Sequence, residues 1–383
     1  MSIFTPSEIE GRHERLRARL GEADACIALS FTNAYYLSGV PIIPWGRPTF
    51  TLVPRDGDAA MVLAEGEKPR ALEHSPIAEL ATYRDSDGPN APRAVELLAG
   101  LLNRRGLKHI AYDAALASAA SLDGLRALLP DARFVDISDV LDEMRMVSTD
   151  EEVGLLRAAS AVIDQGMETY LAEAKLGEPE VLLAGRACLA MAEFAARTYP
   201  DAEVRVNCYS QQGIRSLQPH TAANGEPLSP GQLMCVVVEA HVWHYMEAVE
   251  RTLALGDITP AQQAYYDAIV EAQRRAIEAV GPGVPCSEVD RAGREVLEAA
   301  GYTNVVAGSG LTRGILSELE GRIDRSNLRN YNATPLEPNT VLTVEPWAVE
   351  PEMGAPRHCD VVRVTETGRE VMTTVRGGII RIG

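Results

Sequence analysis

The sequence has no hydrophobic run of the about 20 residues that are needed to cross a bilayer. Its N-terminal stretch lacks a basic start followed by an apolar core, so no secretory signal is visible. The six cysteines show no CxxC spacing, which is typical of free thiols in a reducing compartment. These absences argue against a membrane partner and predict a cytoplasmic protein.

Positive charge and phosphate-binding motifs are also scarce. The formal net charge is −18, and an acidic surface of this kind repels the phosphates of nucleic acids. No segment resembles the GxxxxGKS or GxxxxGKT loop that cradles phosphate groups. We therefore expect no nucleic-acid partner and no cofactor.

The chain has the composition and length of a two-domain globular enzyme, with 383 residues, 46% apolar and 23% charged. Short β-like runs, residues 35–37 among them, alternate with helical patterns up to about residue 147, which indicates an α/β domain. Ser148 and Glu151 then form a predicted capping box in front of a long helix. We predict an α+β protein with domains at residues 1–147 and 148–383.

The stretch from Gly231 to Ala254 places charged and imidazole side chains in an otherwise core-like strand pair. Because a strand has a side-chain period of two, one face is expected to carry His244, Met246, Ala248 and Glu250. The opposite face is expected to carry Glu239, His241, Trp243, Tyr245 and Glu247. Carboxylates and imidazoles are costly to bury unless they are paired or used, so chemistry is expected here.

Four groups of motifs occur in order and at compatible spacings. They are Trp45-Gly46-Arg47; Gly213 to His220 (GIRSLQPH); Ala248 to Leu253 (AVERTL); and a last group of Gly314 to Ser317, Gly321-Arg322, Leu336 to Pro338 and Val344 to Pro346. Together they resemble the creatinase and aminopeptidase family, and within it the creatinase branch. The resemblance implies a pita-bread catalytic domain preceded by a smaller α/β domain.

The metal-dependent members of that family hold two ions through two Asp, one His and two acidic residues. In the register of the resemblance, these positions fall at Val237, Ala248, Leu311, Glu345 and His358. Only one ligand of the set survives in kind. The resemblance therefore predicts no metal site and a metal-independent reaction.

The resemblance also implies roles for the remaining polar residues. Glu250 and Glu345 would hold a planar cationic group, because two carboxylates can fork onto a guanidinium. Arg47 and Arg322 would hold an anionic group. His220 would be the general base, which takes a proton from water and returns it to the leaving nitrogen.

Further positions are expected to line the substrate pocket. Trp45 would stack on the substrate, and its neighbour Arg47 reaches the site from a partner subunit in the creatinase branch, which implies a homodimer. Leu311 and Cys359 stand where that branch has histidines, and Met246 stands where it has a tyrosine. These changes remove hydrogen-bond donors, so creatine itself is not expected to be the substrate.

The sequence thus predicts a metal-independent, creatinase-like amidinohydrolase. It would cleave a C–N bond in a small guanidino or amidino carboxylate, or in a related zwitterion. Two alternatives stay open: a lyase or other non-hydrolytic enzyme in which His220 abstracts a proton, and a non-catalytic binding paralogue.

Two other interpretations concern the same strand pair. Glu250 and Arg251 could form a buried structural ion pair instead of a binding site. A zinc site on His241, His244 and Glu247 is disfavoured, because a spacing of three puts the two histidines on opposite faces of a strand.

Overall fold

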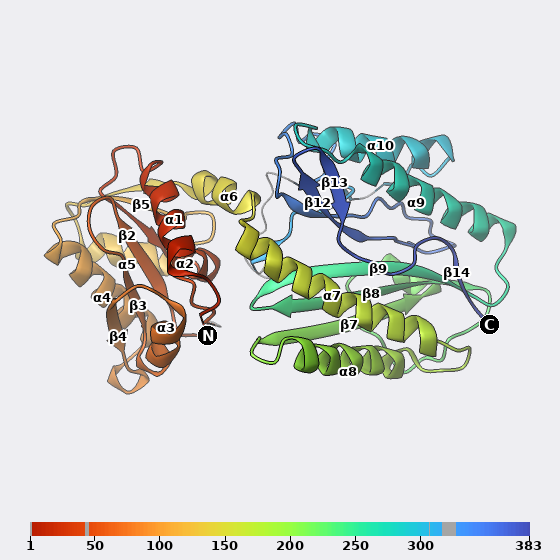
Figure 1. Cartoon of the computed structure of the whole chain (residues 1–383), viewed down its shortest axis with the longest axis horizontal. Coiled ribbons are helices and arrows are strands. Elements are labelled where there is room, and N and C mark those ends of the chain that lie inside the picture. The colour runs from red at the N-terminus through yellow and green to blue at the C-terminus, as the bar shows by residue number, and fades with distance from the viewer. Residues whose placement is uncertain (1, 43–45, 306, 316–326) are drawn as a thin grey trace. The chain divides into compact units, whose positions relative to one another are not determined.

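A computed structural model describes residues 2–42, 46–305, 307–315 and 327–383 (Figure 1). The predicted site residues Trp45 and Arg322 lie outside these ranges. The chain forms two compact units, which divide between Arg145 and Met146.

The first unit is built on a six-stranded sheet with the order β4-β3-β2-β1-β5-β6. Its strands are β1 (Ala25–Ala28), β2 (Phe50–Pro54), β3 (Ala60–Ala64), β4 (Glu79–Tyr83), β5 (His109–Tyr112) and β6 (Arg133–Asp136). Its helices are α1 (Pro6–Arg17), α2 (Phe31–Ser38), α3 (Lys68–His74), α4 (Asn90–Arg104), α5 (Ala119–Leu128) and α6 (Ser138–Met146). Leu98 and Leu102 of α4, four residues apart, join the core of this sheet.

The prediction of a strand at residues 35–37 is wrong, because these residues belong to α2. The Ser30 side chain caps the helix by accepting from the Asn33 N–H, and Gly39 ends it with a φ of 78°. Local capping therefore outweighs the β preference of the two tyrosines.

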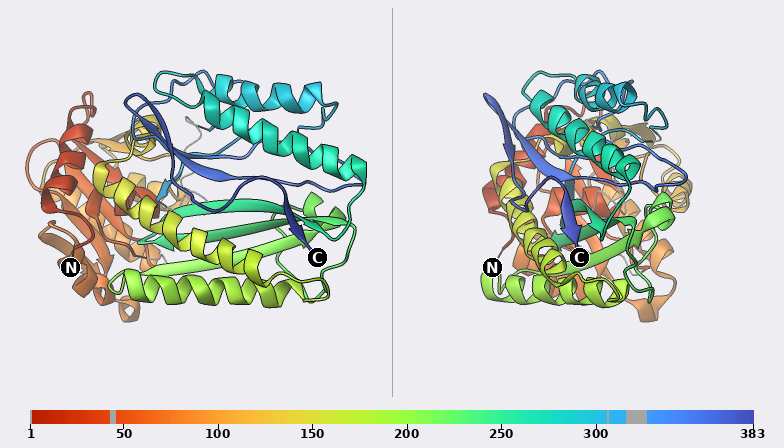
Figure 2. Two further views of the ribbon diagram at one scale, coloured as in Figure 1. Left: turned by 45° about the vertical axis from the view of Figure 1, so that its right-hand side comes forward. Right: turned by 90° about the vertical axis from the view of Figure 1, so that its right-hand side faces the viewer.

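The second unit carries two long helices, α7 (Asp150–Glu173) and α8 (Glu180–Thr198), followed by β7 (Val204–Gln212), β8 (Gln232–Val242) and β9 (Tyr245–Leu255). Helices α9 (Pro260–Ala279) and α10 (Cys286–Ala299) come next, and β10 (Gly314–Ile315), β11 (Val341–Val344), β12 (Asp360–Thr365), β13 (Gly368–Val371) and β14 (Ile380–Ile382) complete the described elements. One sheet has the order β10-β9-β8-β7, with β14 also paired to β9, and a second has the order β11-β12-β13. Figure 2 shows α7 and α8 side by side along the β10-β9-β8-β7 sheet, and α9 beside α10.

Helix α7 begins one residue later than predicted. Thr149 is the capping residue, and its side chain and that of Glu152 form the two reciprocal bonds of a capping box. The prediction that Ser148 and Glu151 form this box is therefore wrong. The shift by one residue keeps the S/T-x-x-E spacing, which is why the sequence allows both registers.

We expect Thr149→Ala to lower the free energy of unfolding by about 1 kcal/mol, because the N–H of Glu152 loses its acceptor. Ser148→Ala is the matched control, since the Ser148 side chain makes no hydrogen bond with the described residues. Denaturant unfolding of both variants measures the difference. Equal losses would contradict the assignment of the cap.

Strands β8 and β9 form a hairpin whose two turn residues, Trp243 and His244, have φ values of 50° and 64°. The register pairs Val237 with Glu250, Glu239 with Ala248 and His241 with Met246. Directly paired residues of an antiparallel hairpin share a face, so Glu239 and His241 lie on the Glu250 face. The predicted assignment of these residues to opposite faces is wrong, because it counted the alternation through the turn.

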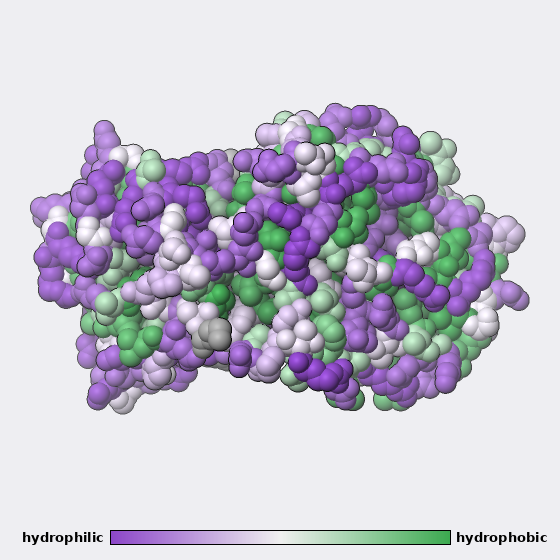
Figure 3. Space-filling model, in the orientation of Figure 1, coloured by the Kyte–Doolittle hydropathy of each residue, from purple (hydrophilic) through white to green (hydrophobic). Residues whose placement is uncertain are grey.

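One face of the molecule is mostly polar. In the orientation of Figure 1, hydrophilic residues cover much of the visible face and hydrophobic ones form smaller patches (Figure 3). Among the described helices, none is long and apolar enough to cross a membrane.

Candidate functional site

Glu250 lies near the middle of β9 on the face described above and is 6% exposed. Its backbone exchanges two hydrogen bonds with Cys359, from Glu250 N to Cys359 O (3.3 Å) and from Cys359 N to Glu250 O (3.1 Å). Glu345 follows β11, and its charge acts on both Glu250 and Cys359. The fold therefore brings together three predicted site residues from separate parts of the chain.

Two further predicted site residues, Met246 and Leu311, lie on or beside the strands that carry Glu250 and Glu345. Met246 is on the same face of β9 as Glu250. Leu311 lies beside β11, where its N–H donates to Thr343 Oγ1 at 3.1 Å. Neither side chain supplies a hydrogen-bonding group of ordinary strength, so both can only shape the pocket.

Arg357 is a site residue that the sequence reasoning missed. It is 5% exposed, and its Nε lies 3.6 Å from Glu250 Oε2. Its guanidinium also lies over the Trp347 ring, 5.5 Å from the centroid. One feature of the sequence could have identified Arg357: it is a charged residue two positions before Cys359, just ahead of a buried strand.

The environment of Glu250 suits proton transfer. Burial raises the pKa of this carboxyl to about 7, with Arg357 opposing the rise and Glu345 adding to it. Its Oε2 is buried and has no hydrogen-bond partner among the described residues. A carboxyl that titrates near neutral pH can donate and accept a proton under the same conditions.

Arg251, next in sequence, points to the other face and has a structural role. It donates to Asp360 Oδ1 (2.7 Å) and to four backbone carbonyl oxygens, those of Glu250, Cys359, Val375 and Arg376. The interpretation of Glu250 and Arg251 as an ion pair is therefore wrong. Asp360 is the acidic partner of Arg251, and Glu250 remains free for the site.

Glu247 is the second buried carboxyl of β9 and lies on the face opposite Glu250. It is 0% exposed, and neither of its oxygens has a hydrogen-bond partner among the described residues. Burial raises its pKa to about 8, while Arg313, whose Nε is 3.8 Å away, opposes the rise. The acid form of Glu247 therefore predominates at neutral pH.

Glu247→Gln is expected to raise the free energy of unfolding above pH 8, by up to about 5 kcal/mol. The pKa is about 8 in the folded state and ordinarily 4.5, so the folded state binds more protons between these values. The wild type therefore loses stability as pH rises through this window, and a glutamine cannot titrate. Denaturant unfolding at pH 5 and above pH 8 measures the effect, which a pH-independent difference between the two proteins would contradict.

His220 lies in the loop after the short 3-10 helix Gly213–Leu217 and is exposed. Its imidazole makes no hydrogen bond with the described residues. The carbonyl oxygen of the preceding Pro219 accepts a hydrogen bond from Arg357 Nη2 at 3.3 Å. Arg357 thus contacts both the loop that carries His220 and the carboxyl of Glu250.

Arg47 belongs to the first unit, where its side chain is 42% exposed. Its Nε and Nη2 donate to Asp85 Oδ2 at 2.9 and 2.6 Å. An exposed pair of this kind contributes at most about 1 kcal/mol, so it does not commit Arg47 to a structural role. Its proposed contact with substrate stays a prediction.

His358 does not belong to the cluster. It is 0% exposed and packs against Tyr266, with 6.0 Å between ring centroids. Burial lowers its pKa well below the ordinary value. The assignment of a ligand position to His358 is wrong by one residue, because neighbouring residues point to opposite sides and Cys359 is the one near Glu345.

The described side chains do not fit the two-ion site of the metal-dependent relatives. Val237, Ala248 and Leu311 carry no donor atom, and burial raises the pKa of the Cys359 thiol well above its ordinary value. Within the described ranges, no group of three or more His, Cys, Asp or Glu side chains could hold a metal ion. His244 is a turn residue whose Nδ1 lies 2.9 Å from Arg205 Nη2, so the zinc alternative also finds no support.

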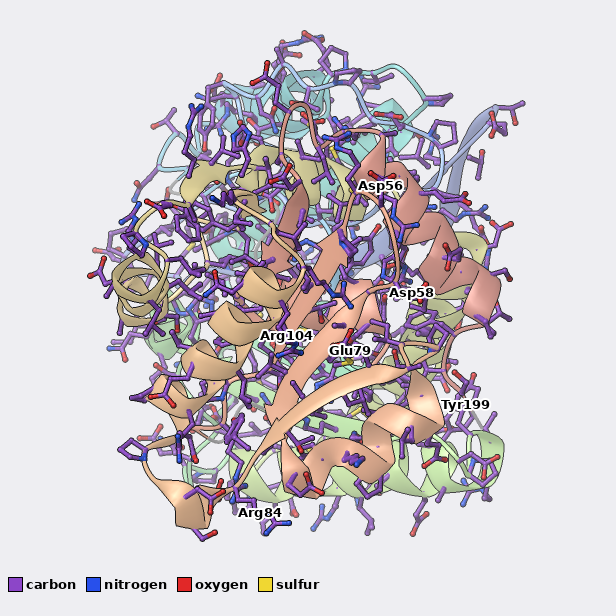
Figure 4. The ribbon with its side chains drawn as sticks, turned by 90° about the vertical axis from the view of Figure 1, so that its left-hand side faces the viewer. Asp56, Asp58, Glu79, Arg84, Arg104 and Tyr199 are labelled. Atoms are coloured by element: carbon purple, nitrogen blue, oxygen red, sulfur yellow. The ribbon has the colours of Figure 1, made fainter. Side chains whose placement is uncertain are left out.

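The first unit contains a separate cavity of about 690 Å³. Four of the charged residues that line it pair with one another: Arg105 donates to Glu79, and Arg17 donates to Glu10 at 3.3 Å. Arg104, close to this cavity, lies 3.4 Å from Glu79 (Figure 4). None of the predicted site residues lines this cavity.

Comparison with protein families assigns both parts of the chain. Residues 154–366 match metallopeptidase family M24, and residues 12–147 match the creatinase/prolidase N-terminal domain. An Xaa-Pro dipeptidase from Pyrococcus furiosus is 28% identical over 63% of this chain and 66% of that protein. Creatinase from Bacillus sp. is 27% identical over 97% of this chain and 91% of that protein.

Solved structures confirm the predicted fold. The Xaa-Pro dipeptidase from Bacillus anthracis superposes with a TM-score of 0.82 at 21% identity, over 98% of this chain and 100% of that one. The prolidase from Pyrococcus horikoshii OT3 also gives 0.82, at 22% identity, over 96% and 99%. The catalytic part is therefore a pita-bread domain preceded by a smaller N-terminal domain.

These comparisons correct the predicted function. The matching family is one of metallopeptidases, and Xaa-Pro dipeptidases recur among the relatives and the similar structures, whereas creatinase is one distant relative. The prediction of a metal-independent, creatinase-like amidinohydrolase is therefore wrong. The coarser prediction, a hydrolase that acts on C–N bonds, agrees with the family. The chain belongs to metallopeptidase family M24, and its creatinase/prolidase N-terminal domain precedes a pita-bread hydrolase domain.

Proposed function

We propose that this protein hydrolyses the C–N bond of a small peptide-like amide and that Glu250 moves the proton that the leaving nitrogen requires. The observation that carries the proposal is the buried Glu250 carboxyl, whose pKa is raised to about 7 and whose Oε2 has no partner among the described residues. Family membership supports the C–N bond as the target.

Amide hydrolysis needs two proton movements. Water loses a proton as it adds to the carbonyl carbon, and the nitrogen gains one as the C–N bond breaks. Glu345 lies close enough to raise the pKa of Glu250, since two negative charges side by side are unfavourable. We assign the protonated state to Glu250, which donates to the nitrogen, and the water-activating role to His220.

Arg357 supplies the positive charge at this site. Its position 3.6 Å from Glu250 balances the carboxylate that forms when Glu250 gives up its proton. A buried guanidinium can also stabilise the negative charge that develops on the substrate carbonyl oxygen. Each of these roles falls to a side chain of the protein itself.

A dipeptide is a small zwitterion, and the names of the Xaa-Pro dipeptidases make Xaa-Pro dipeptides the first substrates to test. From the resemblance we also propose a homodimer in which Arg47 contacts the substrate carboxylate across the interface. Light scattering during size-exclusion chromatography measures the mass, and a monomer at micromolar concentration would exclude that arrangement.

The proposed function is tested with a panel of Xaa-Pro dipeptides, other dipeptides and N-acyl amino acids, each with and without added Mn²⁺, Co²⁺ or Zn²⁺. Mass spectrometry detects the released amine. We expect at least one substrate to be cleaved, with a limb near pH 7 in the profile of kcat/KM. A folded protein that cleaves nothing in the panel, or a profile without that limb, would contradict the proposal.

A further inference from the structure

The exposed His220 lies between two backbone carbonyls that buried side chains hold. Gln211, which is 0% exposed, donates from Nε2 to Thr221 O at 2.5 Å and to Pro219 O at 3.5 Å. Arg357 Nη2 donates to the same Pro219 oxygen at 3.3 Å. The carbonyl groups of the two residues that flank His220 are therefore held from the interior of the second unit.

Exposed loop carbonyls ordinarily bind water, so they do not require buried protein donors. Burying an amide and a guanidinium carries a desolvation cost that only well-made hydrogen bonds offset. Here the donors serve the residues directly flanking His220, while the His220 side chain itself has no bond to the described residues. This arrangement restrains the backbone that carries the imidazole without occupying the imidazole nitrogens.

Both donors come from firmly placed backbone. Gln211 is near the end of β7 and pairs with Cys235 of β8. The backbone of Arg357 is bonded twice to the Thr252 hydroxyl of β9, which accepts from Arg357 N (2.8 Å) and donates to Arg357 O (2.7 Å). The strands that carry the site therefore also carry the donors.

A separate brace holds the rest of the loop. Glu180 of α8 accepts from Gln212 N at 3.0 Å and from Arg215 Nη1 at 2.7 Å. Arg215 Nη2 in turn donates to Ala222 O at 3.1 Å. This brace fixes the two ends of the segment 212–222, but its contacts end at Ala222 and do not reach the peptide groups next to His220.

We propose that Gln211 and Arg357 are positioning residues that hold His220 in the orientation needed to act with Glu250. Arg357 makes the connection, because it contacts both the loop at Pro219 and the carboxyl of Glu250. The inference rests on the proposed function in one respect, namely that His220 and Glu250 serve the same reaction. Beyond that function, Gln211 and Arg357 are assigned the role of orienting His220 relative to Glu250.

The test is nuclear magnetic resonance of the histidine Cε1–H groups as a function of pH, with His220→Gln used to assign the His220 signal among the seven histidines. Gln211→Met keeps the size of the side chain and removes the donor. We expect the Cε1–H signal of His220 to change its chemical shift or to broaden, because the backbone that carries the imidazole loses a donor. Gln218→Ala is the matched control, since Gln218 belongs to the same loop and, within the described ranges, its side chain bonds only the Thr221 hydroxyl and neither flanking carbonyl.

Kinetics supply the second readout. Gln211→Met is expected to lower kcat about tenfold with little change in KM, because a misplaced base slows the chemical step without weakening binding. Arg357→Lys keeps the charge beside Glu250 but shortens the reach to Pro219, and we expect the same direction of change. The Gln218→Ala control is expected to match the wild type in both readouts.

The outcomes separate the two proposals. Altered His220 signals in a protein that cleaves no substrate would overturn the proposed function and leave the positioning role standing. A cleaving enzyme whose His220 signal and kcat are unchanged in Gln211→Met would overturn the positioning role. Should Gln211→Met fail to fold, the His220 signal of Arg357→Lys supplies the comparison; its kcat does not, because Arg357 also contacts Glu250.

Discussion

Glu250→Gln is expected to lower kcat/KM by about a hundredfold or more on any substrate that the wild type cleaves. Glutamine has nearly the same shape as the protonated carboxyl, so it keeps the packing of a side chain that is 6% exposed. It cannot give up or take a proton. The loss should therefore fall on kcat, and the limb near pH 7 should disappear from the profile.

Glu247→Gln is the matched control for this experiment. Glu247 lies on the same strand, is also buried, and has a pKa raised by the same physical cause, but it faces the other side of the sheet. The control should retain most of the wild-type activity. Equal losses in the two variants would show that a buried carboxyl of β9 supports the fold rather than the reaction.

Arg251→Met is expected to lower the free energy of unfolding by about 3–5 kcal/mol. Arg251 is 1% exposed, and all of its nitrogens donate, to Asp360 and to four backbone carbonyls. Methionine fills a similar volume but leaves the Asp360 carboxylate with one charged partner fewer and the carbonyls without donors. Each unmet buried group adds to the loss.

The matched control for stability is Arg274→Met. Arg274 also makes close ion pairs, at 2.6 Å with Glu271 and 2.5 Å with Glu278, but its side chain is 51% exposed. Exposed pairs contribute little, so the change should stay within about 0.5 kcal/mol. Thermal and denaturant unfolding of the two variants compare them directly. Similar values would contradict the structural role assigned to Arg251.

The sequence predicted the family, the fold and the strand that carries Glu250, because these depend on motifs and on local periodicity. The prediction of strand faces failed at the turn between β8 and β9, because side chains do not keep alternating through a two-residue turn. Trp243 and His244 adopt positive φ there, and Glu239 lies on the face of Glu250. Alternation along a chain predicts faces only within a single strand. A two-residue turn has to be recognised first.

The donors around His220 could not be predicted from local patterns. Gln211, Pro219 and Arg357 meet only because β7, the loop and the segment before β12 converge in the folded chain. Each of these residues has an ordinary sequence context on its own. Contacts of this kind depend on the tertiary arrangement, for which hydrophobic periodicity carries no information.

The predicted reaction class failed for a different reason. Val237, Ala248 and Leu311 at the ligand positions argued for a metal-free branch, but the chain matches a metallopeptidase family and Xaa-Pro dipeptidases recur among its relatives and similar structures. A few substituted positions describe what a site lacks. They do not identify the bond that the enzyme cleaves.

The central claim is that the Glu250 carboxyl exchanges its proton near neutral pH inside a buried site. Infrared difference spectroscopy over pH 4 to 9, comparing the wild type with Glu250→Gln, measures this ionisation directly through the carboxyl and carboxylate bands. We expect a carboxyl band that belongs to Glu250 and disappears with a midpoint near pH 7. A midpoint close to the ordinary value of 4.5 would contradict it.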